Sequence, residues 1–226
     1  MGYSRIVSVD RGAIEVTAVP NPWVPEHGSD PPSAPTPPST SAPPPPAASG
    51  QDVMRTGAAG PHPGLTPPRR ADRLGTFTPA TTSGVWVVGA HGGAGESTLA
   101  EVVGGASTDH RWPQLQATPS VLLVARTSFS GITAAQAAAV AWASGATPPV
   151  RVIGLAWVAD APGRLPRQLA DFVKLVSGSV PHHWMLPWVE DLRLGGLAAL
   201  DAGIPKGFQS AQSEIHRLIA RPEEQS

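Results

Sequence analysis

Three almost uninterrupted apolar runs constrain the fold of this chain more than any other feature. They cover residues 84–90, 121–125 and 150–159, and the first of them ends in glycines. Runs without polar alternation are typical of strands that are buried on both faces, as in a parallel sheet. A fourth and weaker run covers residues 184–187.

Helical patterns alternate with these runs. One begins at Ser97, an alanine-rich one covers residues 133–144, and another covers residues 209–220. Between the third and fourth runs, apolar residues at Leu165, Leu169, Phe172 and Val176 recur on one helical face. The alternation predicts an α/β fold: a compact, mostly parallel sheet of about four to five strands with helices on both faces.

Proline divides the chain. Sixteen of its 27 prolines lie between Pro20 and Pro68. This region has too few large apolar residues to offset the entropy of ordering. We therefore predict a disordered Pro-rich linker over residues 20–80, with polyproline stretches that act as a stiff spacer or as a ligand for a Pro-binding domain. Before it, residues 1–19 alternate in a pattern that predicts a β-hairpin. The folded domain is expected over residues 81–220, and residues 221–226 form a tail.

Charge, cysteine content and hydropathy exclude several classes of function. The 16 basic and 17 acidic residues nearly cancel, so direct nucleic-acid binding through phosphates is not expected. The chain has no cysteine, which excludes disulfides, thiolate metal sites and cysteine catalysis. No apolar run approaches the roughly 18 residues of a membrane span, and residues 1–18 lack the apolar core of a signal peptide. These features predict a cytoplasmic protein.

The segment from His91 to Thr98 is the main candidate for a binding site. It reads His-Gly-Gly-Ala-Gly-Glu-Ser-Thr and joins the first buried run to a helix. Glycines in that context let backbone N–H groups converge on an anion at a helix N-terminus. The structural alternative is a glycine turn whose helix is closed by a capping box from Thr98 to Glu101.

The same segment resembles the deviant Walker A loop of the ParA/MinD class of P-loop ATPases, which reads Lys-Gly-Gly-x-Gly-Lys-Ser/Thr. Gly92, Gly93 and Gly95 match the glycines of that loop, Ala94 fills its variable position, and Ser97 matches the magnesium-binding hydroxyl. The resemblance implies a P-loop-like fold and a cofactor of ATP or GTP with magnesium. It places Ser97 on magnesium only if nucleotide binds.

Both lysines of that loop are replaced in this chain. His91 stands at the signature lysine, and Glu96 stands at the phosphate-binding lysine. A lysine about 4 Å from a phosphate charge contributes about 4 kcal/mol at an effective dielectric near 20, and a carboxylate there would repel instead. Two compensations are open. Glu96 could itself occupy the anion site, which a helix N-terminus favours, or a protonated His91 could restore some positive charge.

A weaker resemblance to the class extends over residues 84–220. Asp160 ends the strand that carries an adenine-contacting asparagine in the class, and Pro187 lies in the loop whose proline is near the base. Asp160 also follows its strand as a Walker B aspartate would. A full ParA/MinD domain has further strands between positions equivalent to Val103 and Ser120, where this sequence has room for one short connection.

Segments around the glycine loop, Asp160 and Pro187 are also similar to an uncharacterised actinobacterial family of P-loop-like proteins. That similarity implies that Glu96 is a family trait, and it supplies no activity. Trp184 and Trp188, which flank Pro187, are expected in the core or its rim, or stacked on a ligand.

Three hypotheses follow. The first is a non-hydrolysing interaction or regulatory module, derived from ParA/MinD-type ATPases, that binds a protein partner. The second is a nucleotide-binding protein or weak NTPase with a modified loop. The third is an accessory factor to a DNA-segregation ATPase, a hypothesis that rests on fold analogy alone. No catalytic residue and no protein metal site are assigned, and an enzyme is not favoured.

Overall fold

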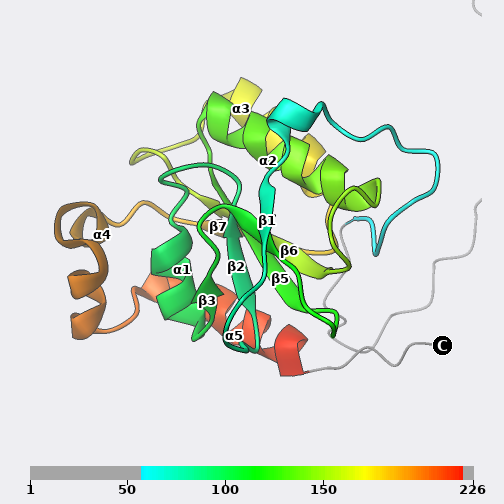
Figure 1. The fold of residues 1–226 in the computed structure, drawn as a ribbon. Helices are drawn as coiled ribbons and strands as arrows, with labels where there is room; N and C mark the ends of the chain where they lie inside the picture. Colours follow the sequence, from blue (N-terminus) through cyan, green and yellow to red (C-terminus); the bar gives the residue numbers. More distant parts are fainter. Residues whose placement is uncertain (1–56, 221–226) are drawn as a thin grey trace, which may run out of the picture. The chain divides into compact units, whose positions relative to one another are not determined.

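The computed structural model describes residues 57–220 (Figure 1). The predicted hairpin over residues 1–19, the linker up to residue 56 and the tail over residues 221–226 lie outside the described residues. In chain order the elements are η1 (Arg70–Asp72), β1 (Gly75–Phe77), β2 (Trp86–Gly89), α1 (Glu96–Val103), β3 (Ala106–Ser107), β4 (Arg111–Pro113), β5 (Ser120–Arg126), α2 (Phe129–Ala143), β6 (Arg151–Val158), α3 (Arg167–Ser177), β7 (His183–Leu186), α4 (Glu190–Gly195), η2 (Gly196–Ala202) and α5 (Lys206–Ala220).

The main sheet has five strands in the order β3-β2-β5-β6-β7, and every neighbouring pair is parallel. This confirms the predicted α/β fold with a parallel sheet. From β2 the chain first moves outward to β3 and later returns to β5 on the other side of β2. The strand order therefore reverses between β2 and β5, and such a switch point opens a crevice at the carboxyl ends of the strands.

Helices cover both faces of the sheet, as predicted (Figure 1). Side chains of the strands alternate between the two faces: Leu123 and Trp157 pack toward α2 and α3, whereas Leu122 and Val124 pack toward α1 and α5. The residues of the central strands β2, β5 and β6 are almost fully buried, which explains why these strands appear in the sequence as continuous apolar runs.

The ordered domain begins earlier than predicted. Residues 57–80 were expected within the disordered linker, but they contain η1 and β1. Strand β1 pairs in parallel with β4, and the Phe77 ring lies edge-on to Trp86 with 5.9 Å between the ring centroids. A few apolar side chains, Leu74 and Phe77 among them, pack on the core and order this stretch despite its prolines.

The connection between Val103 and Ser120 is also richer than expected. It holds two short strands, of which β3 extends the main sheet beside β2 and β4 pairs with β1. Strand β3 has two residues and β4 has three, which are too few to form a recognisable apolar pattern in the sequence. In residues 57–220, no helix is both long and apolar enough to cross a membrane.

A glycine in β6 permits the close approach of β7. A Cβ atom at Gly154 would lie 2.5 Å from the carbonyl oxygen of His182 and 2.6 Å from the Trp184 ring. We expect Gly154→Ala to destabilise the domain by roughly 1–3 kcal/mol, because backbone must move to admit the methyl group. Chemical denaturation measures this. Gly145→Ala, in the loop after α2, is the comparison variant. A Cβ there meets no atom within 4 Å, so its loss of stability reports backbone strain at a φ of 72° and no steric clash.

Candidate functional site

The candidate site lies at the carboxyl edge of the sheet, across the switch point. Four connections meet there: the glycine loop after β2, residues 126–128 after β5, residues 159–163 after β6 and residues 187–189 after β7. The parallel arrangement brings these segments together although they are up to about 100 residues apart in the sequence. This is where open α/β sheets bind ligands.

Three adjoining cavities occupy this edge. The polar cavity, of about 380 Å³, is lined by His91, Gly92, Gly93, Arg126, Ser128, Ser130, Asp160, Trp188 and Arg193. The aromatic cavity, of about 110 Å³, has Gly95, Thr98, Leu99, Pro187, Trp188 and Phe208 among its lining residues. The loop cavity, of about 600 Å³, is lined mainly by residues 160–166 and 185–188. Trp188 borders all three cavities, and together we call them the recess.

The glycine loop presents helix α1 to this recess. Gly93 and Gly95 have φ values of 74° and 95°, a left-handed conformation that glycine adopts without strain. Gly95 is the N-cap residue of α1, and no side chain caps that end. The capping box predicted from Thr98 to Glu101 is therefore wrong: the helix starts at Glu96, two residues too early for Thr98 to cap it. The first N–H groups of α1 are left without a side-chain partner.

Arg126, at the end of β5, ties the loop to the sheet. Its Nε donates to the Gly93 carbonyl at 3.1 Å, and a terminal nitrogen donates to the Ala159 carbonyl at 3.2 Å. The guanidinium has five N–H groups, so the remaining three are available to the polar and aromatic cavities that it borders. Arg126 was not predicted as a site residue from the sequence. The signal that could have identified it is a lone arginine directly after the apolar run of residues 121–125.

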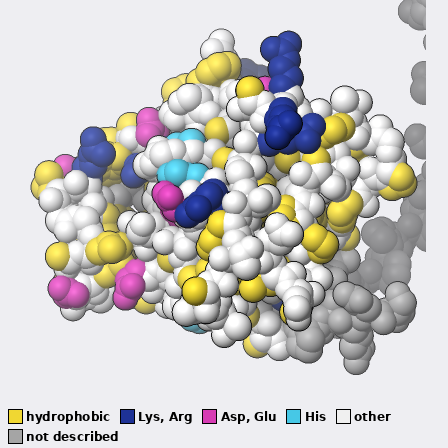
Figure 2. Space-filling model, viewed as in Figure 1, with side chains coloured by type: hydrophobic (Ala, Val, Ile, Leu, Met, Phe, Trp, Pro, Cys, Tyr) yellow, Lys and Arg dark blue, Asp and Glu magenta, His cyan; other side chains and the backbone are white. Residues whose placement is uncertain are grey.

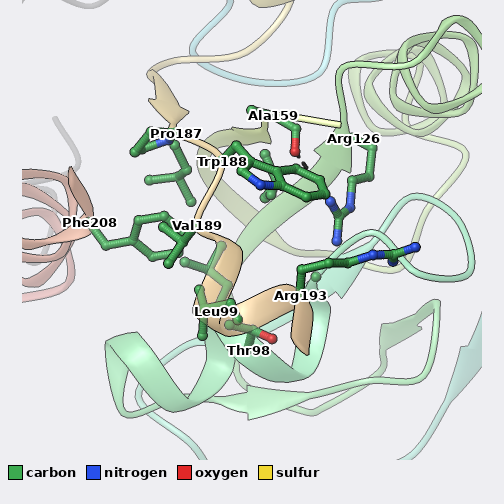
Figure 3. A pocket seen from close by; sticks show the side chains of 13 residues that line it. Thr98, Leu99, Arg126, Ala159, Pro187, Trp188, Val189, Arg193 and Phe208 are labelled. Atoms are coloured by element: carbon green, nitrogen blue, oxygen red, sulfur yellow. Dashed lines mark hydrogen bonds between the residues drawn. The ribbon is translucent and has the colours of Figure 1, made fainter. Parts of the chain in front are cut away.

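Arg193 on α4 brings a second positive charge to the recess. Figure 3 shows Arg193 passing close to Arg126, with the Trp188 ring beside both. Within residues 57–220, neither arginine forms an ion pair with an acidic side chain. Arg193 was not predicted either, because α4 has no strong helical pattern in the sequence and its position depends on tertiary packing.

His91 is neutral in this arrangement. Its Nε2 accepts a hydrogen bond from the backbone N–H of Arg126 at 3.1 Å, so that nitrogen carries no proton. Nδ1 then carries the proton and donates to the Gly92 carbonyl at 2.9 Å. The hypothesis that a protonated His91 replaces the lost lysine charge is therefore wrong for this conformation. The positive charge comes from Arg126 and Arg193.

Glu96 is buried, with 6% of its surface exposed, and its carboxylate leaves the glycine loop. It accepts hydrogen bonds from the backbone N–H groups of Thr108, Asp109 and His110 and from the Thr108 hydroxyl. His110 Nδ1 lies 2.9 Å from Oε2. The hypothesis that Glu96 fills the anion site of its own loop is wrong, because the carboxylate fills a different set of amides.

The structure thus brings most of the predicted residues together. His91, Gly92, Gly93, Gly95, Thr98, Asp160 and Pro187 all border the recess. Ala94 is buried beneath the loop, whereas Ser97 is exposed and borders none of the three cavities. Trp184 is a core residue with 6% exposure, and Trp188 belongs to the site.

In residues 57–220, no group of three His, Cys, Asp or Glu side chains is placed to hold a metal ion. A protein-family model described as a family of unknown function matches residues 83–210, more than half of the chain. No curated protein and no solved structure matches the chain.

Proposed function

The chain belongs to this family, DUF6668, and from that premise we propose that its domain is a non-hydrolysing binding module for a phosphate-bearing small molecule of the mononucleotide class. One observation carries the proposal: Arg126 and Arg193, without acidic partners among the described residues, border a polar cavity that also contains the glycine loop. Two such guanidinium groups on one recess are typical of a site for an anion.

The position of Glu96 removes the main objection to an anionic ligand. If the loop had the arrangement of the P-loop ATPases that it resembles, a carboxylate at this position would face the phosphate and repel it. Here three backbone N–H groups and a hydroxyl satisfy the carboxylate on the far side of β2, next to His110. The free N–H groups at the start of α1 can then favour a phosphate, with the partial positive charge of the helix N-terminus.

Trp188 gives the recess a place for a planar group. Its ring borders all three cavities, and its indole nitrogen donates to Glu190 at 2.7 Å, which fixes the ring in orientation. Figure 3 shows the ring between the apolar side chains of the aromatic cavity and the two arginines. A ligand that joins an aromatic base to a phosphate has this distribution of apolar and charged groups.

The residues fit the phosphate of such a ligand better than magnesium. Ser97, which the resemblance assigns to magnesium, is exposed and does not border the recess. Asp160 is the acidic residue that borders the polar cavity, and its N–H is held by the Thr127 hydroxyl at 3.1 Å. We therefore assign no step to magnesium and no hydrolysis to the site.

Isothermal titration of the full chain with ATP, ADP, GTP and inorganic phosphate tests the proposal. We expect at least one nucleotide to bind with a dissociation constant below about 1 mM, equally well with magnesium and with EDTA, and to be recovered unhydrolysed. Absence of heat with every ligand would overturn the proposal and favour the alternative, a module that acts through a protein partner. Dependence on magnesium or release of phosphate would favour the NTPase hypothesis.

Replacement of Arg193 by glutamine should weaken that binding about tenfold without changing stability. The arginine is exposed on α4 and has no ion pair among the described residues, so the variant removes little except charge at the recess. Arg217→Gln, on the exposed side of α5, makes the same charge change away from the recess. Equal affinities for the two variants would exclude Arg193 from the site.

A further inference from the structure

Residues 108–110 form an internal site for a carboxylate. The N–H groups of Thr108, Asp109 and His110 all point at Glu96, with 2.7 Å from Asp109 and 3.2 Å from His110. The Thr108 hydroxyl adds a fourth donor at 3.1 Å. Successive backbone N–H groups that converge in this way make an anion-binding concavity. In this chain its occupant is a side chain from α1.

The backbone of this segment is held in a conformation that its residues rarely adopt. Asp109 and His110 have φ values of 55° and 57°, and they are the non-glycine residues with positive φ in the described part of the chain. Such residues persist where their surroundings determine the conformation. The Glu96 carboxylate is the group on which all three N–H groups converge, so it is the contact that holds the strained turn.

The contact adds a link from α1 to the turn before β4, a strand that the buried Trp112 ring also anchors in the core. Glu96 is the first residue of α1, immediately after the glycine loop. The turn leads into β4, which pairs with β1 in the separate two-stranded sheet. In Figure 2, histidine side chains lie beside an acidic and a basic side chain on the surface above α1. The charged groups next to His110 are Glu96 and the ion pair of Asp109 and Arg111. In that pair, a terminal guanidinium nitrogen of Arg111 lies 3.6 Å from Asp109 Oδ2.

We propose that residues 108–110 are an oxyanion site occupied by Glu96, and that this contact is a releasable latch between the glycine loop and the β1–β4 pair. When the carboxylate leaves, the N–H groups of residues 108–110 lose the acceptor on which they converge, and the turn that leads into β4 loses its hydrogen bonds to α1. When the Glu96 carboxylate is absent, a small free oxyanion such as formate can accept hydrogen bonds from the same N–H groups. The inference does not depend on the proposed ligand, and its test uses no nucleotide.

Glycine at position 89 supports this assignment. A Cβ atom there would lie 2.6 Å from both Glu96 Oε2 and His110 Nδ1. The end of β2 therefore leaves room for the carboxylate and the imidazole side by side. Gly89→Ala should displace the carboxylate from the turn without altering the residues of the latch.

Amide hydrogen exchange of the full chain tests the latch. In Glu96→Ala, the amides of residues 108–110 should exchange at least about tenfold faster than in the unmodified chain, and those of residues 111–113 and 75–77 should follow. Sodium formate should restore most of the protection, whereas sodium chloride at equal ionic strength should not. Glu101→Ala, at an exposed position of the same helix, should leave these amides unchanged.

Three results would overturn the inference. Unchanged exchange at residues 108–110 in the alanine variant would show that Glu96 does not hold the turn. A lack of difference between formate and chloride would show that the turn is not an oxyanion site. Faster exchange confined to residues 108–110 would show that the contact does not extend to β1 and β4. If Glu96→Ala does not fold, Gly89→Ala and Glu96→Gln replace it, and unchanged exchange in both contradicts the latch.

Discussion

Replacement of Arg126 by glutamine is expected to weaken binding of the phosphate-bearing ligand by about 10- to 100-fold. A hydrogen bond to a charged group contributes about 1.5–3 kcal/mol, and each 1.4 kcal/mol is a factor of about ten in affinity. Arg126 also fastens the glycine loop through the Gly93 carbonyl and the end of β6 through the Ala159 carbonyl. Its loss therefore removes a positive charge from the recess and also the hydrogen bonds that hold the glycine loop in place.

Titration of Arg126→Gln with the best ligand of the unmodified chain measures this effect. Arg126→Lys is the informative companion variant, because lysine keeps the charge but lacks the planar fork that reaches two carbonyls. An intermediate affinity is expected for the lysine variant. If the glutamine variant binds as well as the unmodified chain, Arg126 serves only to hold the loop, and the proposed anion site is in the wrong place.

Replacement of Trp157 by alanine is expected to destabilise the domain by about 3–5 kcal/mol. Trp157 lies in β6, has no exposed surface and packs in the core beneath α2 and α3. Its indole nitrogen also donates to the Ser177 hydroxyl at 2.9 Å, a buried hydrogen bond that alanine would leave unmade. The variant thus creates a large cavity and an unpaired hydroxyl at the end of α3.

Urea denaturation of Trp157→Ala and Trp157→Phe separates the two contributions. The phenylalanine variant keeps most of the ring volume and should lose less stability than the alanine variant. Trp188→Ala is the control, because this ring borders the recess and should cost far less on removal. Similar losses for Trp157→Ala and Trp188→Ala would contradict the placement of Trp157 in the core.

The pattern of apolar runs and amphipathic segments was sufficient to predict the fold class. The runs at residues 84–90, 121–125 and 150–159 became β2, β5 and β6 because a strand buried on both faces needs apolar residues at every position. The short strands β1, β3 and β4 were not predictable in this way. Each has two or three residues, and its pairing partners are set by contacts that form only in the folded domain.

The candidate site, too, was predictable from the sequence only in part. Local sequence predicted the glycine loop after β2, because glycine adopts the left-handed conformations of Gly93 and Gly95 without strain. It also placed Asp160 and Pro187 at strand ends, where a parallel sheet exposes its binding edge. What it could not determine was the destination of the Glu96 carboxylate. The loop residue that seemed to oppose anion binding is satisfied by a turn 12 to 14 residues further along the chain.

Only the tertiary structure decided where the positive charge of the recess comes from. Arg126 and Arg193 are 67 positions apart, on β5 and α4, and neither belongs to the glycine motif. The strand order that brings their backbones to one edge results from packing helices on both faces of the sheet. Charges act through space over several ångströms, whereas a motif records only neighbours in the chain, so the electrostatics of this site could be known only after folding.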